Sequence, residues 1–331
     1  RAIACLLAQE CAVPAGLDIL LKEAQRELSL TLSSRQEDAV RKAFIHLVSI
    51  VTGGPGTGKT TVQKVMLHIY EKLGGTDVLL TAPTGRASRR MAESTGHMEA
   101  MTMHSALGLT CDEDGAETED MLEAGFIIAD EFTMSDMRLS FAFFCHIRKG
   151  SRLVLVGDID QLPSVGPGNV FRELVQCGVI PVTVLDTVFR QGEDSRIITN
   201  AHRMQENNTS LDYGEGFTFI PAKNAKTAGD LVVELYRTCA DRYGIDQVQV
   251  LSPYRRKGDA SVNSLNERLW EICSRKGSGS LEIQSGGHTF RTGDRIIHNK
   301  NREQVSNGDI GYVTKIYEDE EGTRKAKLTF S

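Results

Sequence analysis

One stretch of sequence decides the fold of this chain, and it consists of Gly53, Gly54, Pro55, Gly56, Thr57, Gly58, Lys59 and Thr60. The stretch matches the pattern G-x-x-x-x-G-K-[ST] in full, between a predicted strand at Val48–Thr52 and a predicted helix at Thr61–Leu73. In this setting backbone N–H groups converge on phosphate oxygens, and the N-terminus of the helix favours an anion. We expect Lys59 to reach the β- and γ-phosphates and the Thr60 hydroxyl to ligate magnesium. The alternative, a glycine-rich turn that binds nothing, does not account for the flanking strand and helix.

Three further apolar runs resemble the strand that precedes this loop. They are Val78–Ala82, Phe126–Ala129 and Leu153–Gly157, and helical segments separate them. Nearly all of their residues are apolar, which is typical of strands that are buried on both faces of a parallel sheet. The region from residue 33 to about residue 180 is therefore predicted to be an α/β domain with a parallel sheet.

Polar residues follow two of these strands directly. Asp130 and Glu131 follow the run at Phe126–Ala129, while Asp158 and Gln161 follow the next run. Open α/β sheets bind ligands at the carboxyl ends of their strands. We expect Asp130 to hold the metal, Glu131 to deprotonate the attacking water, and Gln161 to contact the γ-phosphate or that water. The alternatives are acidic residues that merely end a buried strand and a polar loop residue at 161.

Composition excludes several classes of protein. The chain has 331 residues with 38 Lys and Arg against 44 Asp and Glu, so a uniformly basic nucleic-acid coat is excluded, although local basic grooves are not. No apolar run is long enough to cross a membrane, and no signal peptide is present, which predicts a cytoplasmic protein. The seven cysteines lie far apart, which indicates reduced thiols and no structural metal. The first residue is Arg1, and the last, Ser331, closely follows a strand-like run, so we expect a fragment of a longer chain.

The remainder of the chain divides into two regions. A second alternating stretch begins near Pro181, with predicted strands at Val182–Leu185 and Val248–Leu251. Helices are predicted around Ser195–Met204 and Ala228–Arg242. Beyond about residue 280, β runs bounded by glycine take over, including 309–317 and 325–330, and predict a small β module.

Two clusters of basic residues are candidates for contact with a phosphate backbone. The first contains Arg86 and His104 and follows the second strand, and the second contains Arg255 and Arg256. Each cluster fits a groove that tracks nucleic acid, and each fits an ordinary solvated helix face equally well. The sequence argues against a GTPase, because Arg302 stands where the guanine-reading sequence Asn-Lys-x-Asp requires its Asp.

With these motifs in order, the sequence resembles the superfamily 1 DNA helicases of the RecD and TraA type over nearly its whole length. The motifs that carry the resemblance are Leu32–Gln36, Thr52–Thr61, Thr81–Ala87, Thr102–His104, Asp130–Asp136, Gly157–Gly168 and Phe189–Gln191. The run at Gly157–Gly168 matches motif III almost residue for residue. Phe132 and Thr133 depart from the family, which usually has Ala and Ser there, but the acidic pair before them is intact.

The resemblance implies roles for further residues. In the family, Gln36 reads the adenine base, and Thr61 closes the phosphate-binding loop. The DNA contacts it implies lie in motifs Ia and Ib, at Pro83, Thr84, Arg86, Thr102 and His104. Motif IV places Arg190 as an arginine finger that reaches the γ-phosphate. Motifs V and VI of the family do not occur in this sequence.

The resemblance also implies the organisation and activity of the chain. Residues 1–32 correspond to the end of an N-terminal accessory region, 33–180 to a first RecA-like ATPase domain, 181–280 to a partial second RecA-like domain, and 281–331 to an incomplete SH3-like β module. We therefore expect an ATP-dependent DNA helicase motor that uses ATP and Mg²⁺ and moves 5′ to 3′ on single-stranded DNA. DNA repair or conjugation proteins are its expected partners. Two alternatives stay open: an ATPase that remodels RNA or protein complexes, and a nucleotide-gated DNA clamp.

Overall fold

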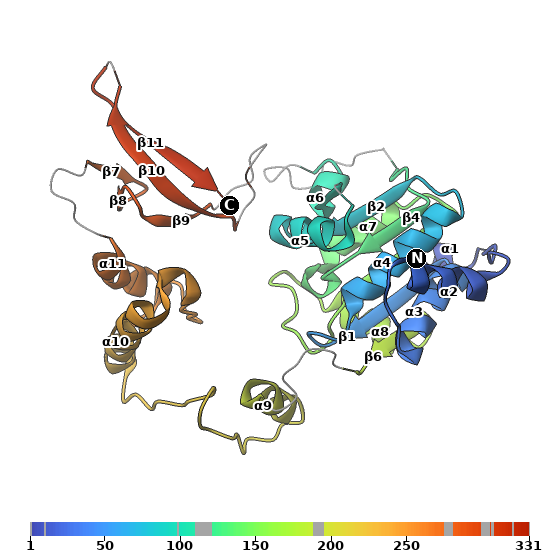
Figure 1. Ribbon diagram of the computed structural model, residues 1–331, viewed down its shortest axis with the longest axis horizontal. Coiled ribbons are helices and arrows are strands. Elements are labelled where there is room, and N and C mark those ends of the chain that lie inside the picture. The colour runs from blue at the N-terminus through green and yellow to red at the C-terminus, as the bar shows by residue number, and fades with distance from the viewer. Residues whose placement is uncertain are drawn as a thin grey trace. The chain divides into compact units, whose positions relative to one another are not determined.

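The computed structural model describes the chain except for residues 1, 10, 98, 110–120, 188–194, 275–280, 299–304, 306, 307, 320 and 331. It consists of two compact units, residues 1–210 and residues 211–331, which are treated separately below (Figure 1). Among the described residues, none of the helices combines the length and the apolar character that a membrane crossing requires.

The first unit is built on a six-stranded sheet in the order β3-β2-β4-β5-β1-β6. Every pair of neighbouring strands in it is parallel. The strands are β1 (Val48–Gly53), β2 (Val78–Ala82), β3 (Ala100–Thr102), β4 (Phe126–Ala129), β5 (Arg152–Gly157) and β6 (Val182–Leu185). The four strands predicted from apolar runs are confirmed to within one residue at each end.

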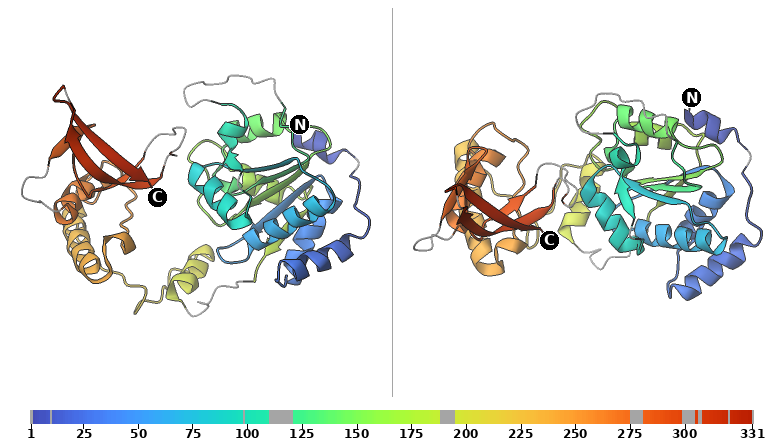
Figure 2. Two further views of the ribbon diagram at one scale, coloured as in Figure 1. Left: turned by 45° about the horizontal axis from the view of Figure 1, so that its top comes forward. Right: turned by 90° about the horizontal axis from the view of Figure 1, so that it is seen from above.

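Two hydrophobic cores cover the two faces of this sheet, because successive side chains of a strand point to opposite faces. In β5, Val154 and Val156 belong to one core, and Leu153 and Leu155 belong to the other. The first core is closed by α2 (Leu17–Glu27), α3 (Ser34–Ile45), α4 (Lys59–Lys72) and α5 (Gly85–Thr95). The second is closed by α1 (Ala2–Leu7), α6 (Met103–Ala106), α7 (Met137–Cys145) and α8 (Val170–Gln176). Figure 2 shows helices on both sides of the sheet.

Strand β6 corrects the predicted organisation. The sequence assigned Val182–Leu185 to a second α/β unit that begins at residue 181, but β6 pairs with β1 in the first sheet, with Val182 opposite Ile50. The ammonium group of Lys42 in α3 also donates a hydrogen bond to the Val182 carbonyl, at 2.9 Å. Whether a strand joins the edge of a sheet depends on a partner strand that is distant in the sequence. The spacing of apolar residues does not reveal that partner. The first compact unit extends through α9 (Arg196–Gln205), a helix that the sequence predicts.

The second unit combines helices with antiparallel strands. Its helical segments are α10 (Ala225–Tyr243), the 3-10 turn η2 (Ile245–Gln247) and α11 (Val262–Cys273). Strands β9 (Arg295–Ile297), β10 (Ile310–Glu318) and β11 (Arg324–Phe330) form one sheet, and β7 (Glu282–Ser285) pairs with β8 (His288–Arg291). The strand predicted at Val248–Leu251 is wrong: these residues belong to neither a helix nor a strand, and Leu251 is 88% exposed. Alternating apolar residues form a strand only where a neighbouring strand accepts their hydrogen bonds.

Helix α11 packs on the β module through one aromatic side chain. The indole N–H of Trp270 donates to Asp294 Oδ2 at 2.7 Å. The guanidinium carbon of Arg291 lies 4.1 Å from the centroid of the Trp270 ring, and Arg291 also forms an ion pair with Glu282 at 2.7 Å. These contacts join α11 to residues beyond 281, the predicted start of the β module.

Candidate active site

The glycine-rich loop leaves the carboxyl end of β1 and enters α4. Gly56 and Gly58 have φ angles of +79° and +84°, in the left-handed region that glycine adopts without steric cost. The Thr57 hydroxyl closes the turn by donating to the Gly54 carbonyl at 2.9 Å. Gly53 also lacks room for a side chain, because a Cβ atom there would lie 2.6 Å from the Leu185 carbonyl oxygen. The loop therefore has the backbone curvature of an anion cradle at a helix N-terminus.

Gln36 supports this loop from the first turn of α3. It is almost fully buried, and its Nε2 donates to the Thr57 carbonyl at 3.1 Å. Its Oε1 accepts from the backbone N–H of Ser33, in a capping box at the N-terminus of α3. A Cβ atom on Gly58 would lie 2.2 Å from Gln36 Nε2, so the amide packs directly against the loop backbone. The resemblance implies that Gln36 reads the base, and in the structure its amide hydrogen-bonds the loop.

Lys59 begins α4, and its ammonium group points back over the loop. It donates to the carbonyl oxygens of Gly53 at 2.5 Å and Gly54 at 3.1 Å. Thr60 and Thr61 occupy the first turn of the same helix. The positive charge of Lys59 beside the N–H groups of the loop is suited to bind the terminal phosphates of a nucleotide.

Asp130 and Glu131 follow β4, at the same edge of the sheet. Asp130 Oδ1 accepts a hydrogen bond from the Glu131 backbone N–H at 2.8 Å, and the Asp130 N–H donates to the Thr81 carbonyl at the end of β2. Glu131 has a φ angle of +49°, a conformation that costs a residue with a side chain about 1–2 kcal/mol. Such strain is found where the position of a side chain matters more than the stability of the backbone.

The carboxyl group of Glu131 is electrostatically unusual. Burial raises the pKa of Glu131 above its ordinary value, the negative charge of Asp130 raises it further, and the positive charges of Lys59 and Arg90 oppose this rise. Its Oε2 atom is buried and makes no hydrogen bond. A buried carboxylate oxygen without a hydrogen-bond partner destabilises the fold, so its presence calls for a functional explanation. A raised pKa suits a carboxylate that acts as a general base. Glu131 is therefore well placed to accept a proton from water.

The turn after β5 is tied to the segment after β4 by Thr133, in the 3-10 turn η1 (Phe132–Met134). The Thr133 hydroxyl accepts from the Asp158 N–H at 3.0 Å and donates to the Asp158 carbonyl at 3.2 Å. That carbonyl also accepts from the Gln161 N–H at 3.1 Å. The Gln161 side chain itself is exposed. Thr133 was not among the predicted site residues, although its place two residues after Glu131 was the available signal.

The donor set fits a magnesium ion. Mg²⁺ prefers oxygen ligands and is usually bound through one or two protein oxygens together with substrate phosphates. Asp130 supplies a carboxylate at the end of β4, the Thr60 hydroxyl lies at the start of α4, and the unpartnered Glu131 oxygen lies beside Asp130.

The remaining predicted site residues, those assigned to DNA contact and to the arginine finger, lie outside the phosphate loop and the acidic pair. Thr84 and Thr102 cap α5 and α6, because their hydroxyls accept from Ala87 N–H and Ser105 N–H. The predicted DNA contacts lie at the edge of the sheet that carries the loop: Pro83, Thr84 and Arg86 follow β2, Thr102 ends β3, and His104 follows it. Arg86 and His104 are exposed. Arg255 and Arg256 are exposed in the second unit. Arg190 lies outside the described residues.

A parallel sheet with this loop after β1 and a carboxylate pair after β4 defines the class of phosphate-loop nucleoside triphosphatases. Residues 31–224, more than half of the chain, match the family model described as AAA domain, and the chain belongs to that family. Residues 265–330 match the SH3 domain of ATP-dependent RecD-like DNA helicases. This second match begins within α11, in agreement with the packing of Trp270 on the β module.

Curated relatives confirm the resemblance to helicases of the RecD and TraA type. The chain is 34% identical over 291 residues to the ATP-dependent RecD2 DNA helicase of Deinococcus radiodurans, which covers 86% of this chain and 38% of the relative. It is 35% identical over 187 residues to the RecBCD enzyme subunit RecD of Mycobacterium tuberculosis, covering 49% and 31%. It is 26% identical over 288 residues to the conjugal transfer protein TraA of Agrobacterium fabrum, covering 81% and 24%. The chain thus spans less than two fifths of the length of each of these relatives.

Solved structures show the same fold. The crystal structure of the Pif1 helicase from Candida albicans matches with a TM-score of 0.56 at 19% identity, over 91% of this chain and 75% of that chain. At this identity the likeness concerns the fold alone, and it confirms the predicted RecA-like architecture.

Proposed function

We propose that this chain is the ATP-binding part of a DNA helicase motor that couples hydrolysis of Mg²⁺-ATP to 5′ to 3′ translocation on single-stranded DNA. The observation that carries the proposal is the position of Glu131. Its buried, unpartnered carboxylate oxygen follows β4, at the edge of the sheet where the phosphate loop presents Lys59. A binding module that does not hydrolyse its nucleotide has no use for a strained base with a raised pKa.

Each residue of the site has a role in this reaction. The loop N–H groups and Lys59 bind the phosphates, and Lys59 exchanges its carbonyl partners for phosphate oxygens. Thr60 and Asp130 hold Mg²⁺, which neutralises charge on the phosphates when it is bound. Glu131 takes a proton from the attacking water, and Gln161 orients that water or senses the γ-phosphate. Arg190 supplies the arginine finger that the resemblance implies.

The proposed DNA contacts come from both units. Arg86 follows β2, which lies next to β4, and His104 follows β3, which lies on the other side of β2. Single-stranded DNA bound by these two side chains would therefore run along the edge of the sheet that carries the nucleotide. Arg255 and Arg256 would provide a second contact in the other unit. The relatives named above as DNA helicases support this assignment, and the cytoplasmic location and the repair or conjugation partners belong to the same proposal.

The test is the ATPase rate of the chain with and without single-stranded DNA, measured beside two variants. We expect Lys59→Ala to lose nucleotide binding, and Glu131→Gln to keep binding but lose turnover. Single-stranded RNA in place of DNA tests the RNA-remodelling alternative. ATP hydrolysis by Glu131→Gln at the wild-type rate would refute the assigned base, and turnover that DNA does not stimulate would refute coupling within this chain.

A further inference from the structure

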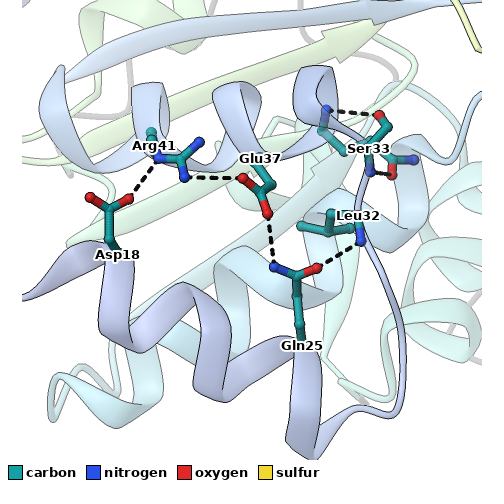
Figure 3. A network of polar contacts seen from close by, with 7 residues as sticks. Asp18, Gln25, Leu32, Ser33, Glu37 and Arg41 are labelled. Carbon is teal, nitrogen blue, oxygen red and sulfur yellow. Dashed lines mark hydrogen bonds and ion pairs between the residues drawn. The ribbon is translucent and has the colours of Figure 1, made fainter.

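Gln25, in the last turn of α2, contacts the next helix and the segment that leads into it. Its Oε1 accepts a hydrogen bond from the Leu32 backbone N–H at 2.8 Å, and its Nε2 donates to Glu37 Oε1 at 3.1 Å (Figure 3). The side chain is partly buried. Both ends of this amide are therefore committed to the region where α3 begins.

These contacts are the first step of a hydrogen-bonded path to the phosphate loop. Leu32 is followed by Ser33, whose backbone N–H and hydroxyl form the capping box with Gln36. Gln36 then donates to the Thr57 carbonyl and packs against Gly58. The path runs from Gln25 through the backbone of residues 32–33 and the Gln36 amide to the loop.

A second link joins α2 and α3 at the far end of the pair. Arg41 donates to Asp18 at 2.8 Å and to Glu37 at 3.0 Å (Figure 3). Asp18 has a side chain that is 72% exposed, so this ion pair contributes little to stability. The two links differ in position: only the one made by Gln25 touches the segment that positions Gln36.

We propose that Gln25 is a positioning residue for nucleotide binding, which acts by holding the entry of α3 and through it the Gln36 amide against the loop. This inference rests on the proposed function, because it requires that the loop binds ATP. It extends the determinants of the site to α2, a helix that belongs to the predicted accessory region and shares no motif with the site.

The experiment measures the affinity for a fluorescent ATP analogue and, at saturating ATP, kcat. We expect Gln25→Leu to weaken binding about fivefold, which corresponds to about 1 kcal/mol, and to leave kcat close to that of the wild type. Gln25→Glu should weaken binding similarly, because its carboxylate faces that of Glu37. The double variant Gln25→Glu with Glu37→Gln places an amide donor at residue 37 opposite a carboxylate acceptor at residue 25. We expect it to recover affinity, and this result is informative even if Gln25→Leu folds poorly.

Two controls separate the possible failures. Asp18→Ala removes the acceptor of the other link between α2 and α3, and its affinity should match that of the wild type. Equal losses in Asp18→Ala and Gln25→Leu would overturn the inference, as would unchanged binding by Gln25→Leu or no recovery in the double variant. Lys59→Ala tests the premise: if it binds the analogue as well as the wild type, the proposed function fails before the role of Gln25 is in question.

Discussion

Replacing Thr133 by valine tests the link between the segments after β4 and β5. Valine has the shape of threonine but lacks the hydroxyl that accepts from the buried Asp158 N–H at 3.0 Å. The Asp158 carbonyl keeps the Gln161 N–H as a donor, so one backbone group loses its partner. An unsatisfied buried donor costs about 1–3 kcal/mol, and in a unit of this size each kcal/mol lowers Tm by about 2–4 °C. The expected loss in Tm is therefore about 2–12 °C.

The matched control is Thr133→Ser, which keeps the hydroxyl and loses one methyl group, at a cost of about 0.8 kcal/mol. Thermal unfolding followed by circular dichroism gives Tm, and steady-state ATP hydrolysis gives kcat. Thr133→Ser should retain kcat, whereas Thr133→Val should lower it, because the turn it loosens carries Gln161. If the valine variant is as stable and as active as the serine variant, the proposed link has no role in holding this turn.

Three further predictions concern other parts of the chain. Because burial raises the pKa of Glu131 in the folded state, the wild type loses stability as pH rises through that pKa. Glu131→Gln cannot ionise, so its gain in Tm over the wild type should be larger at about pH 8 than at about pH 5. An equal gain at both pH values would contradict this prediction. Gly58→Ala displaces the glutamine amide that contacts it and should weaken ATP binding more than about tenfold. Gly96→Ala, at a similar φ of +80° but with open space around it, should lower Tm and leave ATP binding unchanged. Arg291→Met removes a cation above Trp270, the single tryptophan of the chain, and with it the electric field of that charge on the indole, so the wavelength of maximum emission should change. Unchanged emission would argue against that packing.

The elements of the nucleotide site were predictable because their signals are local. The loop at residues 53–60 contains the glycines that its backbone conformation requires. The apolar runs before it and before Asp130 have the composition of buried strands. Parallel strands align their carboxyl ends, so residues that follow different strands were expected at one edge. The structure places Lys59, Glu131 and Gln161 after strands of the same sheet.

Contacts between segments distant in sequence were not predictable in this way. Spacing gives no sign that β6 pairs with β1 or that the residues at 248–251 lack a partner strand. The residue type alone does not show that the Gln36 amide hydrogen-bonds Ser33 and Thr57. Hydrogen bonds of this kind depend on where two chain segments meet, which is a property of the packed molecule.

For this protein, the sequence by itself determined the class of chemistry, because phosphate binding requires specific residue types at a fixed local spacing. Only the tertiary structure decided which groups hold those residues in place. Gln25 lies outside every motif and Thr133 departs from the usual residue of its motif, and each hydrogen-bonds a neighbour that the fold brings to it from another element. The physical reason is that a hydrogen bond extends only about 3 Å, so its partner is fixed by packing and not by position along the chain.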